Sequence, residues 1–82
     1  MSKWSKLYES LRRNPEMRVR FAELCGLLES FGFEHKRTKG SHRSYKHPSV
    51  PVLLTVQPHG KDAVQPQVKQ LLEVVRDFDL HM

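Results

Sequence analysis

The sequence predicts an α+β fold in which three short antiparallel strands are covered on one face by helices. Apolar residues recur at helical spacing in three segments, and three segments between residues 33 and 56 have strand character. Hairpin-length connections join those strands, so the sheet is antiparallel and its second face stays open to solvent. A chain of 82 residues has room for one domain with a modest core.

Residues 3–13 are expected to form the first helix, because four apolar residues follow the spacing i, i+3, i+4, i+7: Trp4, Leu7, Tyr8 and Leu11. Asn14-Pro15 ends it, since the residue before a proline avoids helical geometry. A second helix is expected over residues 21–30, with Gly32 as a left-handed cap. The last helix begins near Pro66, a residue suited to a first helical turn.

The three strands are expected over residues 33–38, 41–47 and 52–56. Lys39-Gly40 forms a tight turn between the first two strands, and residues 48–51, which include two prolines, form the next turn. Residues 57–65 contain Pro58 and Gly60 and are expected to form a loop.

Positive charge is concentrated in the middle of the chain. The net charge is +5 overall. Residues 33–61 carry a net charge of +5 by themselves, because Glu34 is the only acidic residue among six basic ones: Lys36, Arg37, Lys39, Arg43, Lys46 and Lys61. Such a block predicts an anionic partner, with nucleic acid as the first candidate. The alternative is a solvated basic surface that binds nothing.

Cysteine and histidine usage argues against disulfide and metal chemistry. Cys25 is the single cysteine, lies on the apolar stripe of a helix and is expected to be a core residue in a reducing compartment. No pair of histidines has the spacing of a zinc motif, so no metal or other cofactor is expected. The sequence shows no secretory leader and no membrane-spanning run, so a cytoplasmic protein without a membrane partner is expected.

His42 is the candidate for chemistry. Alternation along residues 41–47 places Tyr45 on one side, and Tyr45 is the best core candidate. His42, Ser44 and Lys46 should therefore point outward, which puts an accessible imidazole and a lysine on the open face. A cation can hold an RNA phosphate while a neutral imidazole accepts a proton from the 2′-hydroxyl. The alternative is that His42 is only a polar strand residue.

The same alternation sends Arg43 and His47 toward the core side, which calls for an explanation. Either both residues lie at the sheet margin or the strand contains a bulge. His47 precedes Pro48 and is expected to fix the turn rather than to act in catalysis. His35 is expected to be partly buried or marginal.

The segments Lys39-Gly40-Ser41-His42, Tyr45-Lys46-His47-Pro48 and Leu54-Thr55-Val56-Gln57-Pro58-His59-Gly60-Lys61 resemble the HicA toxin family. The resemblance covers about residues 20–78 and implies a double-stranded-RNA-binding-like fold. It also implies a type II toxin–antitoxin role as a metal-independent mRNA interferase, inhibited by a HicB-type antitoxin, with His42 as the catalytic histidine. Within a single domain of residues 1–82, residues 1–19 form a helical extension. Its exposed face could pack on the domain, pair two copies or contact the antitoxin.

The hypothesis is therefore an RNA endonuclease in which His42 is the general base. Several residues are expected to bind RNA: Lys36, Arg37, Lys39, Ser41, Arg43 and Lys46. Two other functions stay open. One is an RNA-binding module without catalysis, and the other is a protein-interaction domain that binds through residues 4–11.

Overall fold

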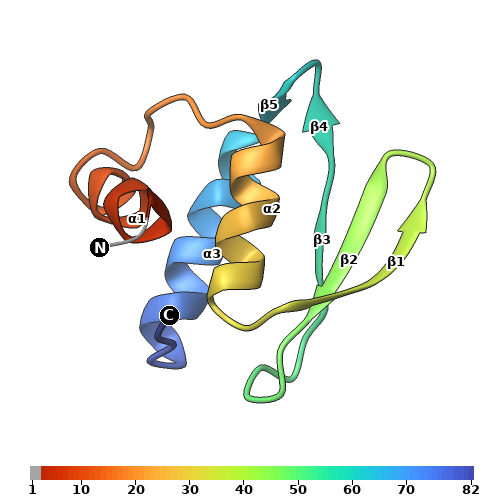
Figure 1. Ribbon diagram of the computed structural model, residues 1–82. Helices are drawn as coiled ribbons and strands as arrows, with labels where there is room; N and C mark the ends of the chain where they lie inside the picture. Colours follow the sequence, from red (N-terminus) through yellow and green to blue (C-terminus); the bar gives the residue numbers. More distant parts are fainter. Residues whose placement is uncertain (1–2) are drawn as a thin grey trace.

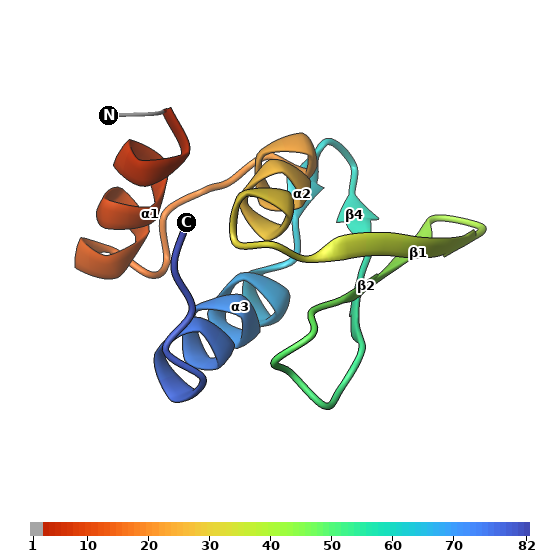
Figure 2. The same ribbon diagram turned by 60° about the horizontal axis from the view of Figure 1, so that its bottom comes forward.

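The computed structural model describes residues 3–82 and confirms the α+β fold (Figure 1). The elements follow in the order α1 (Lys3–Arg13), α2 (Phe21–Ser30), β1 (Glu34–Lys39), β2 (His42–Lys46), β3 (Leu54–Val56), β4 (Pro58–His59), β5 (Asp62–Ala63) and α3 (Gln65–Asp77). Strands β1, β2 and β3 form one antiparallel sheet in that order. Helices α2 and α3 lie side by side on one face of it, and α1 packs outside them (Figures 1 and 2).

The core lies between the sheet and the two inner helices. Tyr45 and Leu54 point into it from neighbouring strands, where they are paired in register. Leu24 and Leu28 of α2 and Val68 of α3 meet them, and all of these side chains are at most 2% exposed. Helical spacing on one side and two-residue alternation on the other produce this layer, as the apolar pattern predicted. Among the described residues, no helix combines the length and apolar content that crossing a membrane needs.

A β-bulge at Lys36 interrupts the pairing of β1 with β2. His35 pairs with Tyr45, whereas Arg37 pairs with Ser44, so Lys36 is the extra residue. Residues before and after a bulge change their alternation, because two residues on one strand oppose one on the other. Arg37 would otherwise share a face with His35 and Tyr45. Because of the bulge it lies opposite Ser44, on the face away from the helices.

The hydrogen bonding of His35 agrees with this register. Its Nε2 lies 2.7 Å from Oγ1 of Thr38, three residues along the strand, so both side chains are on the helix side. The His35 ring also stacks on Tyr45, with centroids 5.2 Å apart. His35 is exposed, so of the two expected positions the marginal one is correct, because β1 is the edge strand and extends past the helices (Figure 2).

The segment predicted as a loop over residues 57–65 contains a second small hairpin. Pro58 pairs with Ala63 and His59 with Asp62, around a turn in which Gly60 has φ 65°. Strands of two residues are too short to show alternation in a sequence, so the loop prediction missed them. The third strand also begins later than predicted, at Leu54.

The N-terminal helix packs on the domain. Its Leu11 is fully buried, and the ring of Tyr8 meets that of Phe31 edge-on with centroids 5.0 Å apart. The indole of Trp4 lies directly against the backbone of Gly26, in the middle of α2, where any Cβ would overlap it. Of the three roles left open for this helix, the structure therefore shows packing on the domain.

We predict that Gly26→Ala destabilises the protein by about 1–3 kcal/mol, because the added methyl group overpacks the α1–α2 contact. In a Trp4→Ala background the same change should instead stabilise by about 0.5–1 kcal/mol, the ordinary gain of alanine over glycine within a helix. Urea unfolding of the four proteins in this double-mutant cycle measures the coupling. Equal effects of Gly26→Ala in both backgrounds would show that Trp4 does not hold the helices together.

Candidate active site on the open sheet face

The open face of the β1–β2 hairpin brings an imidazole together with two cations. His42 is the first residue of β2, is exposed, and pairs with Lys39 across the hairpin. Two residues along, Ser44 pairs with Arg37 on one side and with Thr55 of β3 on the other. Residues directly opposite each other in an antiparallel pair share a face. Near the hairpin tip, the open face therefore presents one imidazole, two cations and two hydroxyl groups.

A two-residue turn places this group at the tip of the hairpin. Lys39 and His42 flank Gly40 and Ser41, and Gly40 has φ 61° at the first central position. Hairpin turns of this length favour glycine there, since side chains rarely adopt a positive φ. His42 thus stands at the end of the sheet, where a large substrate can reach it.

The cations of the β1 strand differ in whether a carboxylate neutralises them. Arg37 and Lys39 form no ion pair within residues 3–82. Lys36, at the bulge, pairs with Glu34 through a 2.7 Å contact between Nζ and Oε2, and its ammonium lowers the pKa of that carboxyl. Arg37 and Lys39 are therefore the cations best able to meet a phosphate beside His42.

Lys46 lies on the expected face but far from the histidine. Four residues of strand separate the two, or about 13 Å. The Lys46 ammonium donates a 3.0 Å hydrogen bond to the carbonyl of Val50. In the strand register, Lys46 lies opposite Glu34 of β1. Sequence reasoning set Lys46 beside His42, whereas the structure sets Lys39 there.

Arg43 and His47 both lie on the helix side of β2, at its two ends. The guanidinium of Arg43 is 5.3 Å from the ring centroid of Phe21, and its Nη1 is 3.8 Å from Sγ of Cys25. The His47 ring packs near Phe33, and its Nδ1 accepts a 2.9 Å hydrogen bond from the Ser49 amide. Of the two explanations, the margin position is therefore correct, and β2 itself has no bulge. Arg43 faces away from His42.

Tyr45 anchors β2 beneath the helices. Its side chain is fully buried, and its hydroxyl oxygen has no hydrogen-bond partner among residues 3–82. Burial raises the pKa of this hydroxyl to about 12. Cys25, the free cysteine beside it, is buried too, as expected of a core residue.

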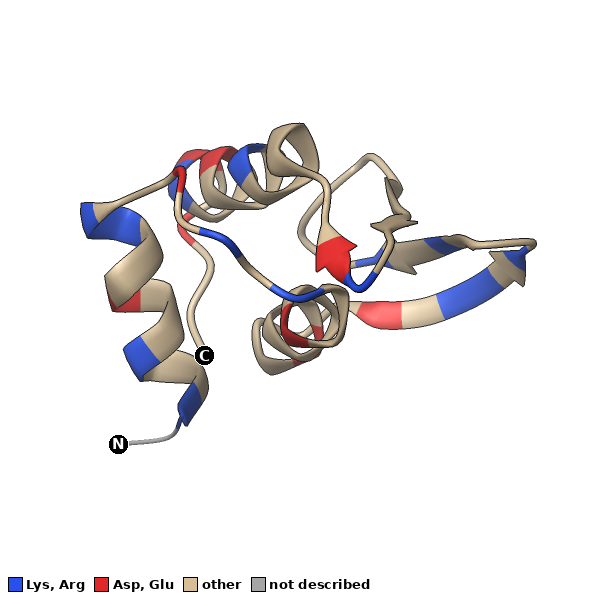
Figure 3. Cartoon of the chain, turned by 90° about the horizontal axis from the view of Figure 1, so that it is seen from above, with Lys and Arg blue, Asp and Glu red and all other residues tan. Residues whose placement is uncertain are grey.

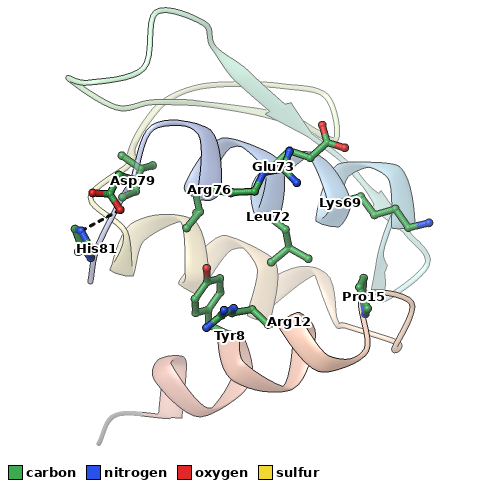
Figure 4. Close-up of a pocket in the computed structure, with 11 residues that line it drawn as sticks. Tyr8, Arg12, Pro15, Lys69, Leu72, Glu73, Arg76, Asp79 and His81 are labelled. Atoms are coloured by element: carbon green, nitrogen blue, oxygen red, sulfur yellow. Dashed lines mark ion pairs between the residues drawn. The ribbon is translucent and has the colours of Figure 1, made fainter.

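The basic character of the hairpin is visible in Figure 3, where blue segments alternate with tan ones along β1 and an acidic segment stands at its start. No cluster of three potential metal ligands occurs in the described part of the chain. A groove of about 680 Å³ lies between α1 and α3 and includes Tyr8 and Leu72 (Figure 4). It lies on the far side of the helices from the sheet, and its rim carries both charge signs. The candidate site is consequently an exposed surface, not a cavity.

The helix–strand–strand–strand–helix order, with one helix-covered face, defines a small domain of the double-stranded-RNA-binding type. The family model described as HicA toxin of bacterial toxin–antitoxin matches residues 21–75. That range runs from the first residue of α2 to the last turns of α3, and the chain belongs to this family. Comparison with curated proteins and with solved structures gave no match. The α1 helix lies outside the matched residues.

Sequence reasoning named Arg37 as an RNA-binding residue but did not assign it to a face of the sheet. It also did not single out Thr55, whose hydroxyl oxygen is 3.4 Å from that of Ser44. A run of basic residues along a strand gives no signal for a bulge. Only the pairing partners reveal these two neighbours of the histidine.

We predict that Tyr45 makes stability fall at high pH. The unfolded chain loses the hydroxyl proton near pH 10, whereas the folded protein keeps it until about pH 12. In that window the unfolded state binds fewer protons, so the free energy of unfolding declines by up to about 2–3 kcal/mol. Urea unfolding between pH 8 and about 12 should show a flatter profile for Tyr45→Phe than for the wild type. Tyr8→Phe, which removes the other tyrosine hydroxyl, is the control, and a flattened profile there would contradict the assignment.

We also predict that Arg37→Ala weakens binding of single-stranded RNA more than Lys46→Ala does, by about tenfold against less than about twofold. Arg37 is free and near His42, whereas Lys46 is bonded to a carbonyl at the other end of β2. Fluorescence anisotropy at fixed salt measures both variants in a His42→Ala background. Equal losses would mean that total charge matters and position does not.

Proposed function

We propose that this toxin-family protein is an RNA endonuclease that needs no metal ion and uses His42 as its general base. The observation that carries the proposal is the pairing of an exposed histidine with Lys39, next to the free cation Arg37, on an otherwise uncovered sheet face. Long single-stranded RNA can lie across such a surface, whereas an 82-residue chain offers little depth for a small substrate.

The reaction uses the 2′-hydroxyl of RNA as nucleophile. Neutral imidazole of His42 accepts the 2′-hydroxyl proton as the 2′-oxygen attacks phosphorus. The bond between phosphorus and the 5′-oxygen of the next nucleotide then breaks, and this oxygen takes a proton from solvent water. The products carry a 2′,3′-cyclic phosphate and a 5′-hydroxyl. Histidine suits this step because its ordinary pKa is near 6.5, so the neutral form is abundant at neutral pH.

The two cations stabilise the charge that develops on phosphate. A guanidinium and an ammonium can each contact a non-bridging oxygen, and Arg37 can do so with two parallel N–H donors. Charge that is stabilised more in the transition state than in the ground state lowers the barrier. The hydroxyl groups of Ser44 and Thr55 add donors for the same phosphate. Ser41 and Lys36 extend the RNA-binding surface on either side.

The partner protein proposed for this chain is a HicB-type antitoxin, which would inhibit by covering the basic open face. The free cations on this face call for acidic groups on the partner, and His42 at the hairpin tip would then be shielded from RNA. Membership of a toxin–antitoxin family supports a partner of this kind.

One observation favours RNA binding without cleavage. No hydrogen bond to the His42 ring occurs within residues 3–82, so no protein group orients the imidazole before RNA binds. General bases are usually held by a neighbouring group, although contacts of this kind tighten when substrate binds. An RNA-binding module is therefore the second candidate.

We predict that the purified protein cleaves RNA in the presence of EDTA and that His42→Ala reduces the rate by at least about 10²-fold. The variant should bind RNA almost as tightly as the wild type. His81→Ala, which removes an exposed imidazole at the C-terminal end, is the matched control. Gel analysis and end labelling report the rate and the product ends.

Products with a 3′-hydroxyl and a 5′-phosphate would overturn this mechanism. Equal rates for the wild type and His42→Ala would mean that another residue is the base. RNA binding by both proteins with no cleavage by either would establish the second candidate instead.

A further inference from the structure

A concave surface lies on the other side of the hairpin tip from His42. It is a cleft of about 490 Å³ bounded by the β1–β2 turn, the β4–β5 hairpin and the start of α2. Figure 1 shows how these three elements are arranged. Gly40 and Ser41 of the turn line it, and His42 is the next residue along the chain. The cleft is on the helix side of the hairpin, whereas His42 faces the open side. The two surfaces therefore meet at one turn.

Three cations from three separate segments line this cleft: Arg20, Arg43 and Lys61. No aspartate or glutamate lines it, and none of the three cations forms an ion pair within the described residues. The nearby carboxylate of Asp62 is held by Arg18 at 2.8 Å, and that of Glu23 accepts a hydrogen bond from the Arg20 amide. The positive charge of the cleft is thus uncompensated.

Backbone contacts of Arg20 and Lys61 hold the walls of the cleft in place and do not use the charges of these two side chains. Arg43, by contrast, is held by a cation–π contact with Phe21. The Phe21 amide donates a 3.0 Å hydrogen bond to the Lys61 carbonyl, which ties the β4–β5 hairpin to α2. The backbone of Arg20 forms a β-bridge with Asp62. The Phe21 ring and Cys25 flank the Arg43 guanidinium. Such a preformed arrangement lowers the cost of ordering the site on binding.

The apolar residues of the cleft indicate whether its ligand is a nucleotide or an acidic peptide. Phe21 and Pro58 lie among the cations, which offers a flat hydrophobic surface beside a cationic one. A nucleotide combines the two matching parts, because its base stacks on aromatic or apolar surfaces and its phosphate meets cations. An acidic peptide would use the cations and leave Phe21 and Pro58 unmatched.

We propose that this cleft binds one nucleotide of single-stranded RNA, adjacent to the nucleotide that is cleaved at His42. The phosphate contacts Arg20, Arg43 and Lys61, and the base lies against Phe21 and Pro58. The strand crosses the hairpin at Gly40 and Ser41, where no side-chain or backbone atom would meet a Cβ on Gly40 within 4 Å. The proposal rests on RNA being the substrate of His42, and it makes Arg43 a binding residue of this second site.

The first test uses RNA binding in the His42→Ala background, so that cleavage does not interfere. The double variant Arg20→Gln/Lys61→Gln removes two cleft charges, and Lys6→Gln/Arg13→Gln removes two exposed, unpaired charges from α1 as the matched control. We expect the cleft variant to bind a short single-stranded RNA about tenfold more weakly and the control within about twofold. The salt dependence should also fall by about 0.7 in slope for each phosphate that the variant no longer neutralises. Equal losses in the two double variants would overturn the proposal.

The second test uses adenosine monophosphate and the otherwise unchanged protein, so it does not depend on the variants folding. Backbone amide signals of Ala22, Ser41 and Lys61 should shift on titration, and those of α1 should not. A poly-glutamate peptide that shifts these signals when the nucleotide does not would overturn the proposal in favour of an acidic protein partner.

The two proposals fail separately. If the wild type does not cleave RNA but the cleft variant binds RNA more weakly than the control, the cleft stands and the nuclease proposal falls. If the wild type cleaves RNA and the cleft variant binds RNA as tightly as the control does, the cleft proposal falls alone.

Discussion

The register of the β1–β2 hairpin determines which side chains meet on each face of the sheet. The two-residue turn sets Lys39 opposite His42 and Arg37 opposite Ser44. The extra residue Lys36 then changes the alternation of the residues before it. On the other face, the turn aligns Thr38 with Arg43, and the bulge aligns His35 with Tyr45. Because the side-chain period of a strand is two, one added residue moves every side chain beyond it, counted from the turn, to the opposite face. The turn therefore places the cations beside His42, and the bulge lets His35 return to the helix side of the same strand.

Strand β2, five residues long, contributes both to the core and to the candidate site. Tyr45 fills the core between the sheet and the helices, and its burial fixes the orientation of the strand. Because side chains alternate along a strand, His42 and Ser44 then face outward. Arg43 shares the face of Tyr45 but lies beyond the packed core, where the Phe21 ring flanks its guanidinium. The site is therefore exposed while the strand that carries it is firmly packed.

The N-terminal helix adds a third layer outside the residues that match the family. Its contact with α2 depends on Gly26, whose missing side chain leaves room for the Trp4 indole. This layer also creates the groove between α1 and α3, far from the hairpin (Figure 4). Nothing in this arrangement reaches the open sheet face, so α1 supports the domain without covering the candidate site.

The sequence by itself determined the three helices, the three main strands and the outward direction of His42, because helical spacing and the burial of Tyr45 are local signals. It also located the family motif around Gly40, Ser41 and His42. Only the tertiary structure decided which cations stand beside that histidine, since strand pairing among exposed basic residues leaves no mark on the apolar pattern. It also decided the β4–β5 hairpin and the cleft of Arg20, Arg43 and Lys61. Those side chains come from distant segments, and only long-range pairing brings them together.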